Sequence, residues 1–565
     1  MIFLINFFKQ DFFIKYKLKL FLILFIILNS IKLVCFNFYL SQNIQNLPLF
    51  FLIKFGANVI LVSAIFLTLF KHNLKKSAIT FYVLQFIYIL AHICYFKYFN
   101  NYLHLVQSIL LLGEGTKALA HLYFFMDFSI IMLFIDMPLF IYLVKNIKSE
   151  NDLKISFSNY VFIGLSMCLV AYSCFYIVSF INMSNPKKAT PLTVTPSESY
   201  IVRKNGTLVN EIISLATNLN DEKIILGFKY GKKINRSENT GNNPNIVILQ
   251  LESIDSNVVN KKYNGKYIAP FLHSLATNSV YYPYTMSYHM GGGTSDSEFS
   301  IINSIEPSQS YPAMKLRTYT YPNSLVKQFR NNNYDCFAFH GNAGNYFNRD
   351  DAFSLMGFSK YYDIVKMFLK HVGWGAPDKD VLDFATDKIL KNKKPTFSYI
   401  ITMTSHASFK SVYNYYTNHD YDNINDEVVK NYFNSVSYVD KTLEEFVTNI
   451  REQNPNTYVL IWGDHTPAIN KPDYSQASLS YDGKYFEFIP LFILTPDNLV
   501  YRENSRVASF LDIAPTILEL SGIKYNYKTD GDNLLDFDNH DSKIPFKGNY
   551  YSKSDLFNLI SNAGK

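Results

Sequence analysis

Hydrophobic and polar residues are distributed differently on the two sides of residue 183. Before that point, long apolar runs are separated by short polar segments. After it, short apolar runs end in polar clusters and alternate with amphipathic stretches. A chain of 565 residues exceeds one ordinary domain. The pattern therefore predicts a membrane-spanning region followed by a domain that folds in water.

Five apolar runs in the first region are each long enough to cross about 30 Å of hydrocarbon as a helix. They are residues 20–40, 47–70, 78–99, 122–144 and 157–182. A signal peptide is disfavoured because the first run is long, lacks a small-residue cleavage site and is followed at once by more apolar sequence. Buried helices of a soluble protein are the other alternative, but five such runs in succession rarely pack into a water-soluble core.

Lysines indicate how this bundle is oriented. Three clusters fall on one side of the predicted spans: Lys9, Lys15, Lys17 and Lys19; Lys71, Lys75 and Lys76; Lys145, Lys148 and Lys154. The positive-inside rule makes that side cytoplasmic, although Lys97 and Lys117 in an outer loop make the bias imperfect. We expect a multi-pass protein of the cell membrane, with a cytoplasmic N-terminus and everything after residue 183 outside the cytoplasm.

Residues 184–243 read as an extracytoplasmic connector, because they are rich in Pro, Ser, Thr and polar turn-forming residues, with a helical rhythm in between. Cys336 is the only cysteine after the spans, so no disulfide framework is expected there. The net charge of +7 is small for this length and does not indicate a nucleic-acid surface.

From residue 244 the pattern is that of an α/β domain, expected to extend to 530 with a C-terminal extension at 531–565. Apolar runs such as "NIVILQLES", "TFSYIITMTSH" and "TYVLIWGDH" each end in polar residues, and amphipathic helical stretches lie between them. This predicts a mixed, largely parallel sheet with helices on both faces. Ligands bind beyond the carboxyl ends of such strands. The side chains expected to converge there are Glu252, His340, His406, Asp464 and His465.

Two carboxylates and one imidazole, Glu252, Asp464 and His465, suit a divalent cation, with the histidine favouring Mn²⁺ or Zn²⁺ over Mg²⁺. Strand-end Asp and His residues also serve simply to cap helices and turns. Thr294 follows three glycines in "GGGTSDSEF". A threonine hydroxyl becomes a nucleophile when a metal or base stabilises its alkoxide, and a helix starting near Ser295 would direct its amides at an oxyanion. An ordinary N-cap explains the same residues, and both can hold.

Taken together, these motifs resemble those of a known enzyme family. "VILQLES", "GGGTSDSEF", "FHGNAGNYFNRD", "MTSHASF", "IWGDHTP" and "LDIAPTILELSGI" occur in the order found in lipoteichoic acid synthase-type phosphoglycerol transferases of the alkaline phosphatase and sulfatase superfamily. The chain resembles that family over essentially its whole length, with five spans before an outer domain. The resemblance implies an α/β extracytoplasmic domain of alkaline phosphatase and sulfatase type.

The resemblance also implies roles. Thr294 would be the nucleophile and a metal ligand, completing a site with Glu252, Asp464 and His465 for one divalent metal, Mn²⁺ first, with Mg²⁺ or Zn²⁺ as alternatives. The residues that would hold glycerophosphate are His340, Phe347, Arg349 and His406. Phe347 stands where the family typically has Trp. Without the resemblance, a structural ion pair for Arg349 and a core position for the histidines are the alternatives.

The implied reaction moves glycerophosphate from phosphatidylglycerol to a hydroxyl on a teichoic-acid-type polymer, a glycolipid or a glycan. A phosphoethanolamine transferase is the nearest alternative, although such ectodomains typically contain several disulfides and this one has a single cysteine, Cys336. A hydrolase and a catalytically inactive membrane sensor are the others. The sensor is disfavoured because Thr294, Arg349 and the three metal-type residues are all present.

Overall fold

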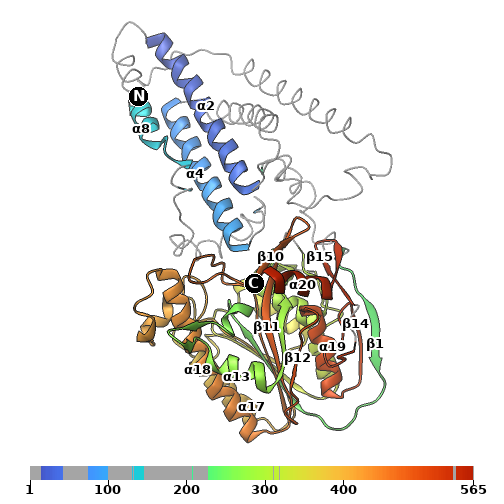
Figure 1. Ribbon diagram of the computed structural model, residues 1–565. Coiled ribbons are helices and arrows are strands. Elements are labelled where there is room, and N and C mark those ends of the chain that lie inside the picture. The colour runs from blue at the N-terminus through green and yellow to red at the C-terminus, as the bar shows by residue number, and fades with distance from the viewer. Residues whose placement is uncertain are drawn as a thin grey trace. The chain divides into compact units, whose positions relative to one another are not determined.

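The structure is a computed structural model that describes residues 14–41, 74–99, 133–145 and 227–563, without 309, 310, 317 and 539–541, together with 103, 130, 207 and 225. The chain divides into two compact units, an N-terminal helical one and a C-terminal α/β one (Figure 1).

The described helices of the N-terminal unit are α2 (Ile14–Ser41), α4 (Leu74–Phe99) and α8 (Met137–Lys145). They pack through aromatic side chains: the ring of Phe25 lies 5.5 Å from that of Phe81 and 6.0 Å from that of Phe140. Among the described residues, one helical stretch, Lys75–Lys97, is long and apolar enough to cross a membrane.

That stretch overlaps the predicted span at 78–99, and α2 contains the one at 20–40. The predicted spans at 47–70 and 157–182 lie outside the described residues, as do residues 122–129, 131 and 132 of the span predicted at 122–144. Five spans therefore stay a prediction.

Asp136 connects the three helical segments of this unit. Lys32 Nζ of α2 lies 2.8 Å from Asp136 Oδ2, and the Tyr82 hydroxyl of α4 donates to Asp136 Oδ1 at 3.0 Å. Lys32 Nζ also lies over the Tyr82 ring, 3.9 Å from its centroid. Charges in apolar surroundings persist when they are paired and hydrogen-bonded, so this group fixes how the segments pack.

The C-terminal unit is built on a ten-stranded mixed sheet. Its main path runs β12 (Tyr501–Arg502), β5 (Val280–Met286), β11 (Lys484–Leu494), β9 (Thr457–Gly463), β2 (Asn245–Leu251), β8 (Thr396–Ile401), β6 (Asp335–His340) and β7 (Lys360–Tyr362). β10 (Ser478–Tyr481) pairs with β11, and β13 (Ala508–Ser509) with β5. The strands from β9 to β7 are mutually parallel, whereas β11 is antiparallel to both neighbours. The predicted mixed, largely parallel sheet is confirmed.

Helices cover both faces of this sheet. α13 (Pro270–Asn278) and α17 (Asp378–Leu390) pack against α18 (Glu427–Gln453), while α14 (Thr294–Asn303) packs against α15 (Leu325–Asn331) and α19 (Phe510–Ser521). Figure 1 shows α17 and α18 on one side of the sheet and α19 on the other. On the α19 side, Ile246 and Ile248 of the fully enclosed central strand β2 join a core with Phe299 and Ile517. α16 (Arg349–Met356) adds Phe353 to that core.

Shorter elements complete the domain. Two-residue strands β3 (Lys262–Tyr263) and β4 (Lys266–Tyr267) pair with each other, as do β15 (Lys543–Phe546) and β16 (Asn549–Ser552). The 3-10 turns are Ser256–Val258, Ala313–Lys315, Tyr346–Asn348, Ser411–Asn414 and His419–Tyr421. The last helix, α20 (Lys553–Ala563), begins with buried Lys553, whose Nζ lies 2.8 Å from Asp512 and 2.6 Å from Asp532.

One segment of the predicted connector is a strand. β1 (Lys232–Arg236) pairs antiparallel with β14 (Tyr525–Thr529), placing Ile234 opposite Tyr527. The polar sequence "KKINR" predicts a turn-forming linker because only Ile234 is apolar. Its partner strand is far away in the chain, so local composition carries no sign of the pairing.

Candidate active site

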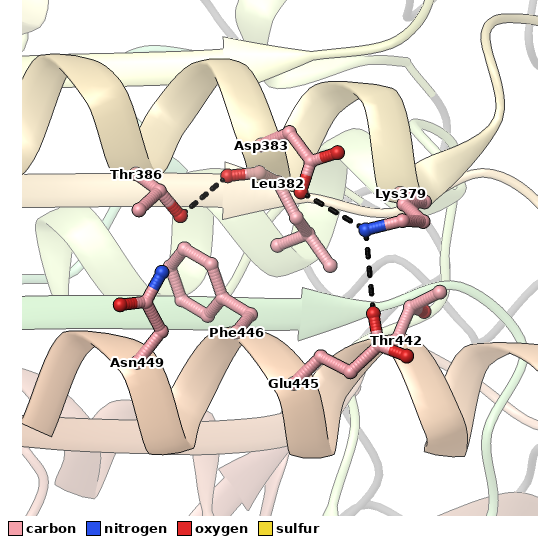
Figure 2. A pocket seen from close by; sticks show the side chains of 8 residues that line it. All are labelled: Lys379, Leu382, Asp383, Thr386, Thr442, Glu445, Phe446 and Asn449. Atoms are coloured by element: carbon pink, nitrogen blue, oxygen red, sulfur yellow. Dashed lines mark hydrogen bonds and ion pairs between the residues drawn. The ribbon is translucent and has the colours of Figure 1, made fainter. Parts of the chain in front are cut away.

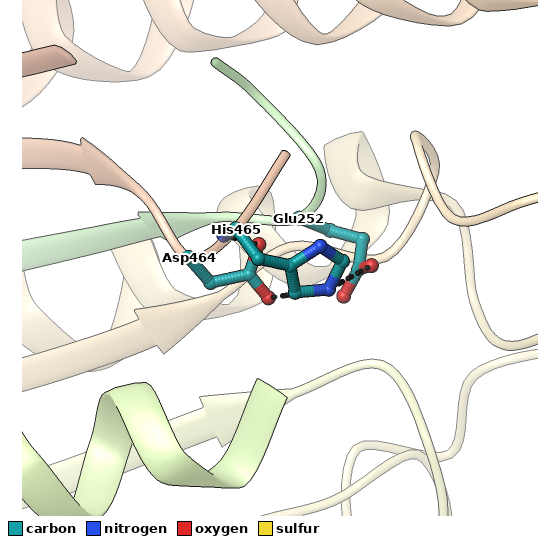
Figure 3. Close-up of side chains that lie close together, drawn as sticks. All are labelled: Glu252, Asp464 and His465. Carbon is teal, nitrogen blue, oxygen red and sulfur yellow. Dashed lines mark hydrogen bonds and ion pairs between the residues drawn. The ribbon is translucent and has the colours of Figure 1, made fainter. Parts of the chain in front are cut away.

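Glu252, Asp464 and His465 follow two adjacent parallel strands, β2 and β9. The register of these strands pairs Leu251 with Gly463, so the residues that come next emerge at the same level. His465 Nε2 lies 3.4 Å from Glu252 Oε1 and 3.6 Å from Asp464 Oδ2, and all three side chains are buried. One potential ligand atom of each lies within 4.8 Å of those of the other two. Figure 3 shows the two carboxylates on either side of the imidazole.

Backbone groups hold these side chains in position. Asp464 Oδ1 accepts hydrogen bonds from the backbone N–H of Ser253 at 2.8 Å and of His465 at 2.7 Å. His465 Nδ1 lies 2.8 Å from the Thr466 carbonyl, which accepts the Nδ1–H. That bond selects the tautomer whose Nε2 lone pair faces the carboxylates, the orientation that metal-ligating histidines commonly have.

The electrostatics of this cluster suit a cation. Burial and the neighbouring Glu252 raise the pKa of Asp464. Burial would also raise the pKa of Glu252, but the attraction of His406 and His465 outweighs it and lowers that pKa. Burial would lower the pKa of His465, yet the Asp464 and Glu252 carboxylates raise it. Such a site attracts positive charge, and Asp464 Oδ2 accepts no hydrogen bond from any residue that the structure describes. Two carboxylates and an imidazole fit Mn²⁺, Zn²⁺ or Mg²⁺.

Thr294 is the first residue of α14 and faces the same cluster. Its hydroxyl donates to Glu252 Oε2 at 3.3 Å. The preceding residue, Gly293, has φ 55° and ψ −133°, a conformation that favours glycine. Asp296 folds back so that its Oδ2 accepts the N–H groups of Met290 and Gly292, each at 2.9 Å. A Cβ at Gly292 would lie 2.2 Å from Asp296 Oδ1, so this glycine makes room for the aspartate.

Arg349 begins α16 and forms a buried ion pair with Glu298 of α14. Arg349 Nη2 lies 2.6 Å from Glu298 Oε1, and Nε lies 2.9 Å from Oε2. Arg349 Nη1 donates to the Tyr346 carbonyl at 3.3 Å. These bonds engage three of the five N–H groups that a guanidinium offers. The structural role considered from the sequence is therefore present, and N–H groups of Nη1 and Nη2 remain for a ligand.

His340 and His406 are each oriented by a carbonyl. His340, the last residue of β6, lies with Nδ1 3.3 Å from the Ile401 carbonyl, and burial followed by the charge of Arg349 lowers its pKa to about 3. A neutral ring that donates through Nδ1 presents Nε2 as an acceptor. His406 Nδ1 lies 2.7 Å from the Ala407 carbonyl, and its ring packs 4.4 Å from that of Trp374.

Phe347 and Asn348, just before Arg349, both have left-handed backbone conformations, with φ 54° and 59°. Such conformations are costly for a non-glycine residue, above all an aromatic one. The Phe347 ring centroid lies 5.7 Å from Arg349 Cζ. The strained turn thus places an aromatic face beside the guanidinium.

Two residues beside the cluster were not predicted from the sequence. The His289 ring stacks on that of His465, with centroids 4.2 Å apart and planes 9° apart. His289 Nδ1 lies 2.9 Å from Glu487 Oε2, and the Thr466 hydroxyl donates to the other oxygen of Glu487. His289 follows β5 and Glu487 lies on β11, an antiparallel pair that the sequence pattern did not reveal. The available signal was that His289 precedes Thr294 by five residues in the same loop.

A surface pocket of about 180 Å³ is lined by residues of α17 and α18. Figure 2 shows Lys379 beside Asp383, to which it pairs at 3.2 Å, and an ion pair of 3.3 Å joins Lys379 to Glu445. None of the lining residues is one predicted for the site. The pocket therefore offers no competing candidate.

Comparison with known proteins agrees with the fold and the motifs. Residues 244–523 match the profile of the sulfatase family. The chain is 24% identical over 551 residues to lipoteichoic acid synthase 2 of Bacillus subtilis (strain 168), covering 91% of this chain and 82% of that protein. It is 26% identical over 534 residues to lipoteichoic acid synthase of Staphylococcus saprophyticus, covering 87% and 80%. The chain is a lipoteichoic acid synthase-type member of the sulfatase superfamily.

The fold of this sulfatase-superfamily chain is also similar to that of a solved integral membrane protein, lipooligosaccharide phosphoethanolamine transferase A of Neisseria meningitidis. The TM-score is 0.50 at 12% identity, covering 88% of this chain and 95% of that one. The likeness is one of fold, and it extends into the N-terminal unit, in agreement with a membrane-embedded N-terminal part. The lipoteichoic acid synthase LtaP of Listeria monocytogenes matches with a TM-score of 0.47 at 24% identity, covering 57% and 89%.

Proposed function

We propose that this sulfatase-superfamily transferase moves glycerophosphate from phosphatidylglycerol to an acceptor hydroxyl through a covalent intermediate on Thr294. The observation that carries the proposal is the position of the Thr294 hydroxyl. It lies at the start of helix α14 and donates a hydrogen bond at 3.3 Å to Glu252, which clusters with Asp464 and His465. The lipoteichoic acid synthases similar to most of the chain support the same reaction class.

A divalent cation held by Glu252, Asp464, His465 and Thr294 would favour the threonine alkoxide and offset phosphate charge. Thr294 Oγ1 attacks the phosphorus, the bond from phosphorus to the diacylglycerol oxygen breaks, and that oxygen takes up the proton that the Thr294 hydroxyl gives up. The positive end of the α14 helix dipole, at Thr294, offsets the charge on the non-bridging oxygens. Glycerophosphate is then esterified to Thr294.

In the second half of the reaction, the acceptor hydroxyl attacks the same phosphorus. The bond from phosphorus to Thr294 Oγ1 breaks, and the threonine oxygen is ready for another cycle. The proton of the acceptor goes to His406, whose ring is oriented by the Ala407 carbonyl at Nδ1 and by packing on Trp374. The acceptor is a hydroxyl of a teichoic-acid-type polymer, a glycolipid or a glycan.

The head group is held by the remaining predicted residues, each in a role set by its hydrogen bonds. The Arg349 N–H groups that are not hydrogen-bonded to Glu298 or Tyr346 bind phosphate oxygens. Neutral His340 accepts from a glycerol hydroxyl through Nε2, a better match than a phosphate oxygen because that nitrogen carries no proton. Phe347 covers the glycerol carbons.

We further propose that the enzyme is a multi-pass protein of the cell membrane, with a cytoplasmic N-terminus and its sulfatase-family domain outside. The donor lipid and its diacylglycerol product both reside in the bilayer, so a membrane-anchored domain meets them there. Mn²⁺ is the metal we test first, with Mg²⁺ and Zn²⁺ as alternatives.

Intact-mass analysis of the full-length protein after incubation with phosphatidylglycerol and Mn²⁺ tests the proposal. We expect a gain of one glycerophosphate, mapped to Thr294, together with release of diacylglycerol. Thr294→Ala should show neither, and Thr294→Ser, which retains a hydroxyl, should still be labelled. An adduct formed only from phosphatidylethanolamine would indicate a phosphoethanolamine transferase instead. No adduct with either lipid would favour an inactive protein.

A further inference from the structure

The loop between β7 and α17, residues 363–377, exposes apolar side chains beside the candidate active site. Phe368 is 93% exposed, more than any other large hydrophobic side chain among the described residues, and Val365 is 69% exposed. A single exposed apolar residue is ordinary on a protein surface. Here two project from one short loop, separated by Lys366 and buried Met367.

This β7–α17 loop is held rigidly. Asp363 Oδ1 accepts from the N–H of Lys366 at 2.9 Å, and backbone N–H groups of Met367 and Leu369 donate to Asp363 and Ile364 at 2.9 and 3.1 Å. Phe368 itself has φ 57°, a left-handed conformation that is unusual for an aromatic residue. The fold therefore maintains a strained backbone that directs Phe368 into solvent.

Both ends of the loop are fastened to segments that carry predicted head-group residues. Near its start, Asp363 Oδ2 accepts from the N–H of Gly344 at 3.0 Å. Near its end, the N–H of Ala376 donates to the carbonyl of Gly341, the residue after His340, at 2.8 Å. Trp374 packs against His406. Whatever binds the tip of this loop is thereby positioned relative to the candidate site.

The charges around the tip favour an anionic surface. Lys366 and Lys370 flank Phe368 and are both exposed. Lys366 is also 2.5 Å from Asp350, with both side chains nearly half exposed, so it remains in contact with solvent. Apolar side chains interleaved with lysines are the composition that binds the boundary between head groups and acyl chains of anionic membranes.

We propose that the β7–α17 loop is a membrane-docking element that inserts Phe368 and Val365 into an anionic lipid surface. The inference rests on the proposed function for its choice of lipid, because phosphatidylglycerol is anionic and is taken from a bilayer. Docking brings His340 and His406 to the level of the head groups, since the loop is bonded to the segments that bear them. Substrate capture from a membrane then depends on Phe368, whereas the chemical step does not.

Kinetics of the full-length protein in vesicles test this separation. With bilayer phosphatidylglycerol, Phe368→Ser should raise KM on the order of fivefold at unchanged kcat, because an interfacial aromatic contributes to surface binding. With short-chain, monomeric phosphatidylglycerol, the variant should match the wild type. Val500→Ser, which removes another exposed apolar side chain (59%) from a different loop, serves as the matched control and should change neither. An unchanged bilayer KM in Phe368→Ser would overturn the docking role.

A second readout does not depend on turnover. A tryptophan introduced by Phe368→Trp should be quenched by brominated phosphatidylglycerol in vesicles, and one introduced by Val500→Trp should not. Equal quenching at both positions, or none at either, contradicts the inference. Failure of the proposed function is a separate result: the wild type would then form no glycerophosphate adduct even with the short-chain lipid, while the Phe368→Trp quenching would still report on docking.

Discussion

The two halves of the candidate site are built in different ways. The metal-type half, Glu252, Asp464 and His465, follows adjacent parallel strands and is fixed by backbone hydrogen bonds. The head-group half is mixed: Phe347 lies in a left-handed turn and partly exposed His406 in a loop, whereas His340 ends β6 and Arg349 begins α16. Strand ends give accurate placement for bond-making chemistry, while loops can change to suit a substrate without disturbing the sheet.

The largest effect should come from Arg349, which pairs with Glu298 on the helix that begins at Thr294. Arg349→Met leaves Glu298 buried without its partner, which costs about 3–5 kcal/mol of stability, and removes the phosphate contact. Thermal unfolding and kcat/KM for glycerophosphate transfer measure the two losses. The double variant Glu298→Gln/Arg349→Met should recover much of the stability but stay at least about 100-fold less active. Recovery of activity along with stability would assign Arg349 a structural role alone.

A substitution at His289 tests whether a residue outside the predicted ligands helps to position the metal-type half. We expect His289→Gln to weaken Mn²⁺ binding by about 10- to 100-fold, as is usual for residues that orient a metal ligand, because the packing against His465 is lost. Titration calorimetry measures this without turnover. His273→Gln is the control, since that histidine stacks on Tyr267 elsewhere in the domain. Equal affinities in both variants would show that His465 is oriented without His289.

In the head-group half, Phe347→Trp should have a modest effect on substrate binding. The indole is larger and adds an N–H donor, so we expect KM for phosphatidylglycerol to fall about two- to fivefold at similar kcat. Discrimination against phosphatidylethanolamine should increase, because a hydrogen bond from the indole can reach a glycerol oxygen. The comparison of both lipids in one competition assay decides the point, and a loss of kcat would mean that the turn tolerates only phenylalanine.

The smallest effect is expected away from both halves, at Asp440 of α18. Its carboxylate accepts the N–H groups of Phe271 and Leu272 at 2.9 and 2.8 Å, yet burial raises its pKa to about 7. The folded state then keeps a proton that the unfolded state releases near pH 4, so this contribution to stability is complete below that pH and is lost as the pH rises towards 7.

Asp440→Asn keeps an acceptor oxygen and removes the titration. Unfolding midpoints of the two proteins, measured at pH 5 and pH 7.5, should therefore differ in their pH dependence by a few degrees, with the variant less sensitive. An equal fall in the two proteins would mean that the folded carboxyl is ionised throughout this pH range.

The sequence predicts those parts of the site in which polar residues directly follow an apolar strand. Glu252 and Asp464 were placed together because parallel strands bring their carboxyl ends to one edge, whichever helices connect them. β5 was not predicted, and β11 was predicted only from residue 490 onward and without its antiparallel direction, because strand direction is decided by tertiary pairing, which one apolar run does not encode. The pairing of Arg349 with Glu298 was likewise open, since either residue alone is compatible with solvent, substrate or an ion pair.

The partnership of β1 with β14 has a consequence for how the domain is made. Synthesis proceeds from the N-terminus, so Lys232–Arg236 emerges before nearly all of the sheet, whereas Tyr525–Thr529 emerges near its end. Until then the early strand has an unpaired edge and only Ile234 to bury, and it cannot remain folded by itself. Closure of this two-stranded sheet therefore marks a late stage of assembly, at which an early and a late segment of the C-terminal unit are joined.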